Sequence, residues 1–503
     1  MCKMDYIIVQ AGGKGSRMER LTRNKPKALV PVNNLPMLFH LFRKYPDKRY
    51  VIIGDYKIDV LESYLNAFAS VDYKLVSGSG HEGTCAGLKD ALAFIPDDEC
   101  FMLIWCDLIL PKEYEVPETD KNVIGISKDF VCRWMYKDGS FKEERSAEYG
   151  VAGHFIFKNK KEIENVPDSG EFVRWLQSEP IAFEEQPLYK TREYGLIEEW
   201  NKLPKNRCRP FNKMTISEDK VVKEAIDKQG EDLAKREIAW YKTMERYAFD
   251  ALPHIYSFSP LAMERVNGKN IYEYADLSLE SKQEILNKIV DGLKRIHGLE
   301  SAPYDEASFR DAYLDKTFNR LSKVKKLVPF ADQPVIDING KKCRNVFYHK
   351  DELKNLVMQY VPKQFSLIHG DPTFSNIMLK EGETPIFIDP RGYFGKTEIY
   401  GDPAYDWVKL YYSLVSNYDQ FNIKRFDLVI GENDVSLNIE SNGFEELEDY
   451  FFALLEKEVS RKQMKVLLAI TWLSLTTYAW EDYDSICGAF YKGELYLEEA
   501  FNE

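Results

Sequence analysis

Hydrophobic residues in the first 200 positions form short runs that are separated by polar and amphipathic stretches. The runs that are short enough for buried strands are YIIVQ (6–10), RYVIIG (49–54), YKLVSG (73–78) and CFMLIWCDLIL (100–110). Between them, CAGLKDALAFI (85–95) has the apolar spacing of a helix. This alternation predicts an α/β domain, Rossmann-like with a mostly parallel sheet, over residues 1–202.

The pattern changes near residue 203. NKLPKNRCRPFNK, rich in proline, asparagine and basic residues, is typical of a linker. After it, KMTISEDKVVKEAI is expected to form a hairpin, EDLAKREIAWYKTMERY a helix, and the last 200 residues long amphipathic helices. We therefore expect an α+β domain over residues 203–503, with a small lobe over about 203–265 and a large helical lobe over about 266–503.

Composition narrows the class of partner. The 503 residues are 44% hydrophobic and 30% charged, with a formal net charge of −13, which works against binding to nucleic acid or an anionic membrane surface. The sequence contains no C-x-x-C pair, no leading signal-like segment and no run of about 18 apolar residues. We expect a cytoplasmic protein with small-molecule partners, without membrane insertion, and leave homo-oligomer formation open.

Glycines and cations follow the first predicted strand, in VQAGGKGSRMERLTRNKPKALVPV (9–32). The spacing is not that of a P-loop, and Met18 stands where G-x-G-x-x-G requires its third glycine. Glycines let backbone N–H groups approach a triphosphate, and cations offset charge that develops on phosphate during attack. A strand-to-helix turn would be the simpler interpretation of the glycines alone.

The whole string resembles the signature of sugar-1-phosphate and phosphocholine nucleotidylyltransferases. The resemblance implies a GT-A type fold in which a nucleotide is held by Gly12, Gly13, Gly15 and Arg17. It also implies that Lys27 contacts the attacking phosphate.

Three later segments fit the same family. EGTCAGLKDAL resembles its GTA segment, which implies that Gly83 and Thr84 line the base or ribose pocket. Asp107 ends an apolar strand, where a carboxylate can bind Mg2+, although such residues also cap helices and turns. In YKTREYGLIEEW, Glu193 stands where sugar-phosphate members usually carry Asp, and it is a candidate second metal ligand.

The C-terminal half contains FSLIHGDPTFSNIML and then PIFIDPRG. These segments resemble the catalytic and metal-binding loops of the aminoglycoside phosphotransferase and choline kinase superfamily, which has a protein-kinase-like fold. The resemblance implies that Asp371 orients or deprotonates a substrate hydroxyl, and that Asn376 and Asp389 bind Mg2+ on the ATP phosphates. We assign His369 a structural role.

Upstream residues complete this second site. Lys223, on an alternating strand, would reach the ATP phosphates, and Glu237 on the next helix would pair with it, although either could be a surface charge. LAMERVNGKNIYEY resembles the hinge between lobes, where backbone groups from Met263 to Val266 would meet adenine.

The segment that follows the second metal-binding loop has structural and aromatic candidates. We expect Asp406 to anchor the catalytic loop. The tyrosine-rich helices after it are predicted to form one wall of the acceptor pocket. Their rings could hold an ammonium group or serve only as core.

Together, the two signatures predict an enzyme that phosphorylates a small metabolite with ATP and then transfers a nucleoside monophosphate to the new phosphate. The product would be a nucleotide-activated precursor for a surface polysaccharide or lipid. CTP and a choline- or ethanolamine-like acceptor are the leading expectation, because a fused choline or ethanolamine kinase and cytidylyltransferase is a family precedent. A sugar kinase joined to a sugar-1-phosphate nucleotidylyltransferase is the alternative, and a nucleotide-binding scaffold without activity is the alternative of another class.

Overall fold

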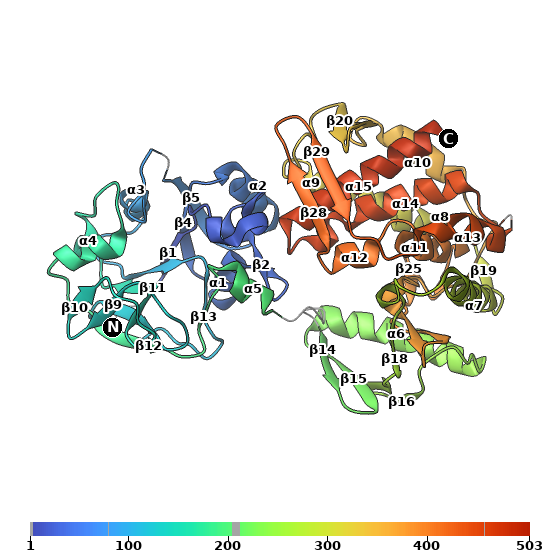
Figure 1. The fold of residues 1–503 in the computed structure, drawn as a ribbon, viewed down its shortest axis with the longest axis horizontal. Helices are drawn as coiled ribbons and strands as arrows, with labels where there is room; N and C mark the ends of the chain where they lie inside the picture. The colour runs from blue at the N-terminus through green and yellow to red at the C-terminus, as the bar shows by residue number, and fades with distance from the viewer. Residues whose placement is uncertain (1–3, 79, 204–211, 457) are drawn as a thin grey trace. The chain divides into compact units, whose positions relative to one another are not determined.

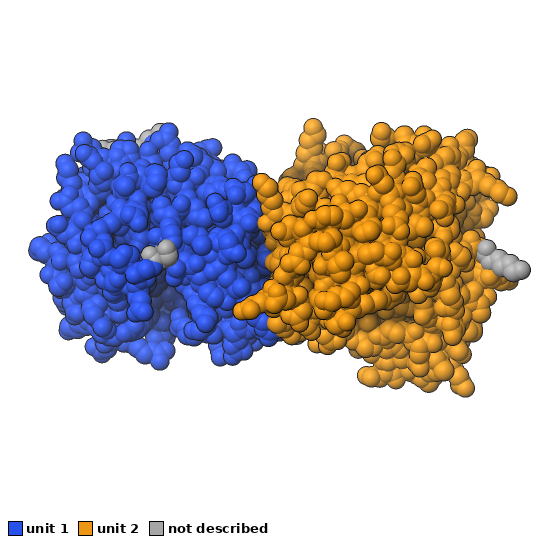
Figure 2. Space-filling view, turned by 90° about the horizontal axis from the view of Figure 1, so that it is seen from above, with its two compact units in different colours: residues 1–204, 481–484 blue, residues 205–480, 485–503 orange. Residues whose placement is uncertain are grey.

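The computed structural model describes residues 4–78, 80–203, 212–456 and 458–503 (Figure 1). The chain divides into two compact units, coloured blue and orange in Figure 2. Unit 1 is Met1–Pro204 with Glu481–Asp484, and unit 2 is Lys205–Trp480 with Ser485–Glu503. Most of the predicted linker, residues 204–211, lies outside the described residues.

Unit 1 is built on a nine-stranded sheet whose main path runs β10-β9-β11-β6-β1-β4-β5, with β8 between β11 and β12. The strands are β1 (Tyr6–Gln10), β4 (Arg49–Gly54), β5 (Asp72–Ser77), β6 (Phe101–Trp105), β8 (Val123–Ser127), β9 (Met135–Lys137), β10 (Ser140–Lys142), β11 (Gly150–Phe157) and β12 (Glu184–Leu188). Strands β5, β4, β1 and β6 are parallel, and β11 runs antiparallel to β6. The α/β prediction is confirmed, with an antiparallel extension beyond β6.

Helices and short strand pairs complete unit 1. They are α1 (Met37–Lys44), α2 (Ile58–Phe68), α3 (Leu88–Leu92), α4 (Phe172–Ser178), α5 (Ile197–Asn201), η1 (Ser16–Thr22), η2 (Lys27–Leu29), η3 (Lys160–Ile163), the pair β2 (Pro31–Val32) and β3 (Leu35–Pro36), and the pair β7 (Leu108–Ile109) and β13 (Arg192–Glu193). Helix α3 is shorter than the predicted 85–95, because Gly87, at φ +74°, has a left-handed backbone that cannot belong to the helix. Apolar side chains such as Ile8, Leu103 and Phe155 are fully buried in the core.

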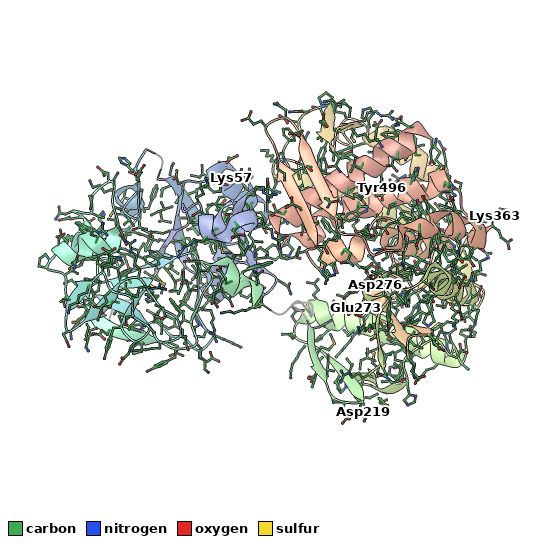
Figure 3. All side chains as sticks on the ribbon, in the orientation of Figure 1. Lys57, Asp219, Glu273, Asp276, Lys363 and Tyr496 are labelled. Atoms are coloured by element: carbon green, nitrogen blue, oxygen red, sulfur yellow. The ribbon has the colours of Figure 1, made fainter. Side chains whose placement is uncertain are left out.

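The small lobe of unit 2 is a four-stranded antiparallel sheet with one long helix. The sheet order is β14-β15-β17-β16, with strands β14 (Asn212–Ile216), β15 (Lys220–Ala225), β16 (Ile255–Phe258) and β17 (Leu261–Glu264). The predicted hairpin is β14–β15, and Figure 3 labels the exposed Asp219 at its turn. The predicted helix is α6 (Lys228–Arg246), which begins where the Asp227 side chain accepts a hydrogen bond from the Gly230 N–H.

The large lobe is mainly helical, as predicted. Its helices are α7 (Leu279–His297), α8 (Glu306–Arg310), α9 (Lys316–Val324), α10 (Lys350–Met358), α11 (Pro403–Leu414), α12 (Tyr418–Asn422), α13 (Glu448–Leu455), α14 (Arg461–Leu475) and α15 (Tyr483–Asn502). Short turns of helix are η4 (Ile271–Glu273), η5 (Asp311–Asp315), η6 (Phe374–Asn376), η7 (Glu445–Leu447) and η8 (Thr476–Ala479). Trp407 of α11 and Trp472 of α14 are buried where these helices pack together.

Small sheets carry the loops of the large lobe. They are formed by β18 (Gly268–Asn270), β23 (Ile377–Lys380) and β24 (Thr384–Phe387); by β19 (Ser301–Pro303), β22 (Gln364–Leu367) and β27 (Tyr400–Gly401); by β20 (Val335–Ile338), β21 (Lys341–Arg344), β28 (Phe426–Ile430) and β29 (Val435–Ile439); and by β25 (Tyr393–Phe394) with β26 (Thr397–Glu398). Across the part of the chain that the structure describes, every helix is too short or too polar to cross a membrane.

Candidate active sites

The glycine-rich loop of unit 1 leaves the sheet at the carboxyl end of β1. In the parallel pairing Gln10 lies opposite Trp105, so the loops after β1 and β6 meet at one edge of the sheet, where open α/β sheets bind ligands. Gly12, Gly13 and Arg17 line a cavity at this edge. Gly15 does not line it, but its left-handed backbone (φ +62°) lies close to Lys27, and any added Cβ would be 3.1 Å from the Lys27 Cβ.

Lys27 and Asp107 form an ion pair at the same edge. Lys27 begins η2, directly after Pro26, and its Nζ donates to Asp107 Oδ2 at 2.5 Å. Asp107 follows β6, and both side chains are largely buried. Burial opposes the charge on Lys27, but the Asp107 carboxylate outweighs it and raises the pKa of Lys27, which stays protonated. The apolar run 100–110 forms two strands, β6 before Asp107 and β7 after it, so Asp107 lies at a strand end as the sequence predicted.

Glu193 joins Asp107 through strand pairing. In the β7–β13 ladder Glu193 lies opposite Leu108, and the Tyr194 N–H donates to the Asp107 carbonyl oxygen at 3.0 Å. Burial, and next the negative charge of Asp107, raise the pKa of Glu193. Two carboxylates therefore lie close together beside Lys27, and a cation between them would relieve this repulsion.

The GTA-like segment forms another part of the same cavity. Gly83 has φ +88°, and a Cβ on it would come within 2.3 Å of the Gly170 carbonyl oxygen, so only glycine fits. Thr84 accepts a hydrogen bond from the Phe172 N–H through Oγ1, at 2.8 Å, and its carbonyl oxygen accepts one from Gln10. Both residues line the cavity as expected, but the Thr84 hydroxyl is already used to hold the segment in place.

The cavity of unit 1 has a volume of about 710 Å3. It brings together all the predicted unit 1 residues except Gly15. Lining residues that the sequence argument did not single out include Asp55, Trp105, Phe130, Trp134 and Glu171. Trp105 was foreseeable as the neighbour of Asp107 at the end of β6, whereas the others come from separate loops and carry no motif.

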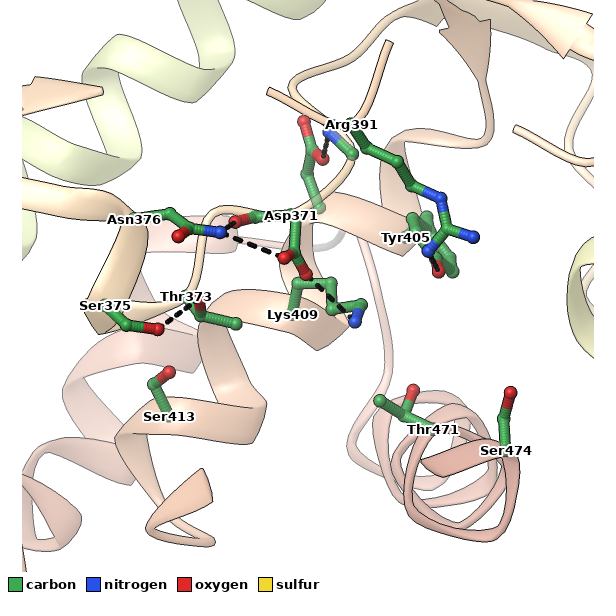
Figure 4. A network of polar contacts seen from close by, with 12 residues as sticks. Asp371, Thr373, Ser375, Asn376, Arg391, Tyr405, Lys409, Ser413, Thr471 and Ser474 are labelled. Carbon is green, nitrogen blue, oxygen red and sulfur yellow. Dashed lines mark hydrogen bonds and ion pairs between the residues drawn. The ribbon is translucent and has the colours of Figure 1, made fainter. Parts of the chain in front are cut away.

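Asp371 and Asn376 form the centre of the candidate site in unit 2. Both belong to the loop between β22 and β23, and Asn376 Nδ2 donates to the Asp371 backbone oxygen and to its Oδ2, each at 2.9 Å (Figure 4). Asp371 Oδ1 forms an ion pair with Lys409 Nζ, at 2.9 Å. Burial alone would raise the pKa of Asp371, but Lys409 holds it below its ordinary value, so the carboxylate is ionised at neutral pH.

Asp406 anchors the loop that carries Asp371, as predicted. It is fully buried in α11, and it accepts hydrogen bonds from the His369 N–H at 2.9 Å, the Gly370 N–H at 2.7 Å and the His297 ring at 2.9 Å. The His369 ring contacts the Ile388 carbonyl oxygen at 3.1 Å. Burial lowers the pKa of His369, which is consistent with a neutral, structural histidine.

Lys223 connects the small lobe to the second metal-ligand candidate. Its ammonium forms an ion pair with Glu237 of α6 at 2.8 Å and another with Asp389. Burial opposes the charge on Lys223, but Asp389 and Glu237 outweigh it and raise its pKa. Lys223 and Glu237 are therefore paired inside the site, and neither is the exposed surface charge that the sequence left as an alternative.

The hinge candidates lie elsewhere. Met263 is buried in β17, where it pairs with Val221 and Ile255, and Val266 is buried just after that strand. Neither residue lines the cavity that contains Asp371. Their contact with adenine stays a prediction.

The cavity of unit 2 has a volume of about 280 Å3 and contains Asp371, Asn376, Asp389, Lys223 and Glu237. The sequence argument missed four cations that line it, namely Lys316, Arg320, Arg391 and Lys409. The helical spacing offered one signal, because Lys409 lies three residues after Asp406 and so on the same face of α11. The tyrosines of the later helices do line this cavity, including Tyr412, Tyr418 and Tyr478.

Both sites can bind Mg2+ only if nucleotide phosphates supply some of its ligands. Among the described residues, no group of three or more histidine, cysteine or acidic side chains is arranged to hold a metal. Asp107 with Glu193, and Asn376 with Asp389, each offer two oxygen-bearing side chains. Mg2+ is commonly bound by one or two carboxylates together with substrate phosphates, so the residues present fit it.

Comparison with known proteins assigns a segment of each unit to a family. Residues 7–117 match the MobA-like NTP transferase domain, and residues 227–427 match the phosphotransferase enzyme family. The chain is a fusion of these two enzyme domains. The fusion therefore combines a nucleotidyltransferase domain with a kinase-like domain, as the sequence predicted.

Several curated proteins and solved structures resemble part of the fusion. The bifunctional protein GlmU of Methanococcus maripaludis is 30% identical over 131 residues, 25% of this chain and 30% of that protein. The UTP–glucose-1-phosphate uridylyltransferase AglF of Haloferax volcanii is 34% identical over 108 residues, 20% of this chain and 43% of that protein. The fusion thus spans less than half the length of these curated relatives. The crystal structure of HddC from Yersinia pseudotuberculosis matches with a TM-score of 0.34 and 20% identity, over 40% of this chain and 97% of that one.

Proposed function

We propose that unit 2 phosphorylates a hydroxyl group of a small metabolite with ATP, and that unit 1 transfers a nucleoside monophosphate to the phosphate so formed. The observation that carries this proposal is that each unit gathers its predicted charged residues around one cavity. Scattered surface charges would not meet in this way.

In the first reaction, the acceptor hydroxyl oxygen attacks the γ-phosphorus of ATP. The bond from that phosphorus to the bridging oxygen breaks, ADP leaves, and the hydroxyl proton passes to Asp371. The ionised Asp371 carboxylate is suited to this role, and Asn376 and Lys409 hold it in position. Lys223, positioned by Glu237, would bind the ATP phosphates.

In the second reaction, a phosphate oxygen of the new product attacks the α-phosphorus of a nucleoside triphosphate, and pyrophosphate leaves. The loop at Gly12 and Gly13 lets the backbone approach the triphosphate, while Arg17 and Lys27 offset the negative charge. Gly83 and Thr84 would border the base or ribose.

Mg2+ would be held by Asn376 and Asp389 in unit 2 and by Asp107 and Glu193 in unit 1, where it neutralises phosphate charge. In both sites the carboxylate that would bind it now pairs with a lysine, Asp389 with Lys223 and Asp107 with Lys27. These ion pairs hold the two carboxylates in place.

CTP is the nucleotide that we propose for unit 1, and UTP or GTP is the alternative. The names of two relatives support that alternative, because they are a UTP–glucose-1-phosphate uridylyltransferase and, from Campylobacter jejuni, a heptose 1-phosphate guanylyltransferase that is 26% identical over 95 residues. A product of this kind would serve as an activated precursor for a surface polysaccharide or lipid. The same names support a sugar as the alternative to an amino alcohol acceptor.

The two activities can be separated in the full-length protein. ADP formation is measured with Mg2+, ATP and a panel of acceptors, and pyrophosphate release is then measured after addition of CTP, UTP or GTP. We expect Asp371→Asn to abolish the first signal and Lys27→Met the second, whereas Asp291→Asn and Lys74→Met, at exposed positions, should change neither. If both signals persist in the two active-site variants, the proposed roles of Asp371 and Lys27 are rejected. If the wild type gives neither signal with any acceptor, the proposal is rejected and a non-catalytic scaffold is favoured.

A further inference from the structure

Three basic side chains that line the phosphotransferase cavity form no ion pair with any residue that the structure describes. Lys316 and Arg320 lie one turn apart on α9, and Arg391 follows β24. The carboxylates of the same cavity are already paired, with Lys409 or with Lys223. Within the described residues, no ion pair joins a carboxylate to any of the three, so the cavity has an excess of positive charge.

The three cations lie on the acceptor side of the cavity, away from the lysine proposed for ATP. The charges that act most strongly on Lys316 are those of Arg391, Arg320 and Lys409, the residue that contacts Asp371. The charges that act most strongly on the pKa of Lys223 are instead those of Asp389 and Glu237. Burial, and next these neighbouring cations, lower the pKa of Lys316 to about 6. An anion bound beside Lys316 would favour its protonated form.

The aromatic rings of the cavity are already in contact with these cations. The Arg391 guanidinium lies 4.3 Å from the centre of the Tyr393 ring, and Arg320 lies 5.6 Å from that of Tyr478. Lys409 lies 5.6 Å from the centre of the Tyr412 ring. Rings that already face the cations of the protein have little left to offer an ammonium ligand.

Hydrogen bonds hold two of the cations, Arg391 and Arg320, in position, and one buried N–H donor, on Arg391, remains without a partner. Arg391 donates to the hydroxyls of Tyr405 and Tyr393, each at 2.8 Å, while its buried Nε has no partner. Arg320 donates to the Ser474 Oγ at 3.1 Å. Thr471 and Ser474 of α14 line the same cavity, and Figure 4 draws both side chains together with Tyr405 and Lys409. A fixed arginine with a free, buried donor is suited to an oxyanion.

We propose that the hydroxyl acceptor of unit 2 carries a carboxylate or phosphate group, which Lys316, Arg320 and Arg391 bind while its hydroxyl faces Asp371. This assignment rests on the phosphotransfer proposed above. It replaces the choline- or ethanolamine-like acceptor expected from the sequence, because an ammonium group would lie beside the unpaired Arg320 and Arg391 and would oppose protonation of Lys316. A neutral sugar would leave their charge uncompensated.

Binding calorimetry on the full chain, in the presence of Mg2+ and ADP at pH 7, tests the charge preference directly. The probes are glycerate for the carboxylate, glycerol 3-phosphate for the phosphate, glycerol as the neutral analogue, and choline and ethanolamine as cations. We expect at least one anion to bind ten times more tightly than glycerol, with no binding of choline or ethanolamine. Which of the two anions binds better distinguishes the carboxylate from the phosphate.

Variants then show where the anion binds. Lys316→Met and Arg320→Met should each weaken binding of the preferred anion at least tenfold, since each removes a charge-assisted contact, and should leave ADP binding within twofold. Lys326→Met, at an exposed position just after α9, is the matched control. Equal binding of glycerol, choline and the anions would overturn the proposal, as would variants that weaken ADP binding and not anion binding.

The same samples separate this proposal from the one on which it rests. Anion binding that is lost in Lys316→Met, without any ADP formation that depends on Asp371, would reject phosphotransfer and keep the anion site. ADP formation with choline or a neutral sugar as the best acceptor would reject the anion site and keep phosphotransfer.

Discussion

The Asp406→Asn substitution probes how the loop that carries Asp371 is held. The Asp406 carboxylate accepts three hydrogen bonds, from the His369 and Gly370 N–H groups and from His297. An asparagine has one acceptor oxygen, so its NH2 group must face at least one buried N–H. A buried donor left unpaired costs about 1–3 kcal/mol, and the remaining bonds lose the strengthening that a charge provides. We expect local destabilisation of about 3 kcal/mol, which corresponds to amide exchange about 100-fold faster.

Hydrogen exchange followed by mass spectrometry measures this in the full-length protein. Peptides that cover residues 365–380 should exchange faster in Asp406→Asn, while peptides that cover β4 (Arg49–Gly54) in unit 1 should not change. Asp291→Asn, at an exposed position of α7, is the control. The reasoning is refuted if the 365–380 peptides exchange at the wild-type rate in Asp406→Asn.

Three further predictions follow from particular contacts. Gly153→Ala should destabilise unit 1 by more than about 3 kcal/mol in urea unfolding, because its Cβ would lie 2.1 Å from the Trp105 ring at φ +76°; a variant that unfolds like the wild type would contradict this. Burial lowers the pKa of His154 to about 4 in the native state. In the unfolded chain the same imidazole takes up a proton near pH 6.5, whereas in the native state it stays neutral until the pH falls to about 4. The unfolding free energy should therefore fall by about 2 kcal/mol between pH 7 and 5, and His154→Gln should remove that component; the same pH dependence in both proteins would argue against it. Lys316→Met should raise the stability of the ligand-free protein by about 1–2 kcal/mol in thermal unfolding, since it removes an amine whose protonation is opposed by burial and next by Arg391 and Arg320; a lower melting temperature would count against the cation cluster.

Local patterns in the sequence predicted those parts of the fold that depend on neighbouring residues. The runs at residues 6–10 and 49–54 form β1 and β4, because a continuous apolar run satisfies both buried faces of a parallel strand. The hairpin at Asp219 and the helix after Asp227 follow from turn and cap chemistry. Asp107 was placed at a strand end from the sequence, but its ion pair with Lys27 was not predicted, since the two residues lie 80 positions apart in sequence.

The candidate sites were predicted where a motif lies on one loop. Asp371 and Asn376 are five residues apart and hydrogen-bonded to each other, so the loop itself sets their geometry. Lys316 and Arg320 belong to a helix about 50 residues earlier, and their spacing shows only that they share a face. Which way that face points depends on the packing of α9 against α14, a long-range contact that no local pattern encodes.

The central claim is that one chain carries two separate transfer activities, and the most direct measurement follows both in wild type, Asp371→Asn and Lys27→Met. With ATP, an acceptor and a second nucleoside triphosphate present, the wild type should release ADP and then pyrophosphate. Asp371→Asn should release neither until the phosphorylated acceptor is supplied, and Lys27→Met should release ADP alone. If supplying the phosphorylated acceptor to Asp371→Asn restores no pyrophosphate release, or if Lys27→Met loses both signals while staying folded, the account of two successive sites is contradicted.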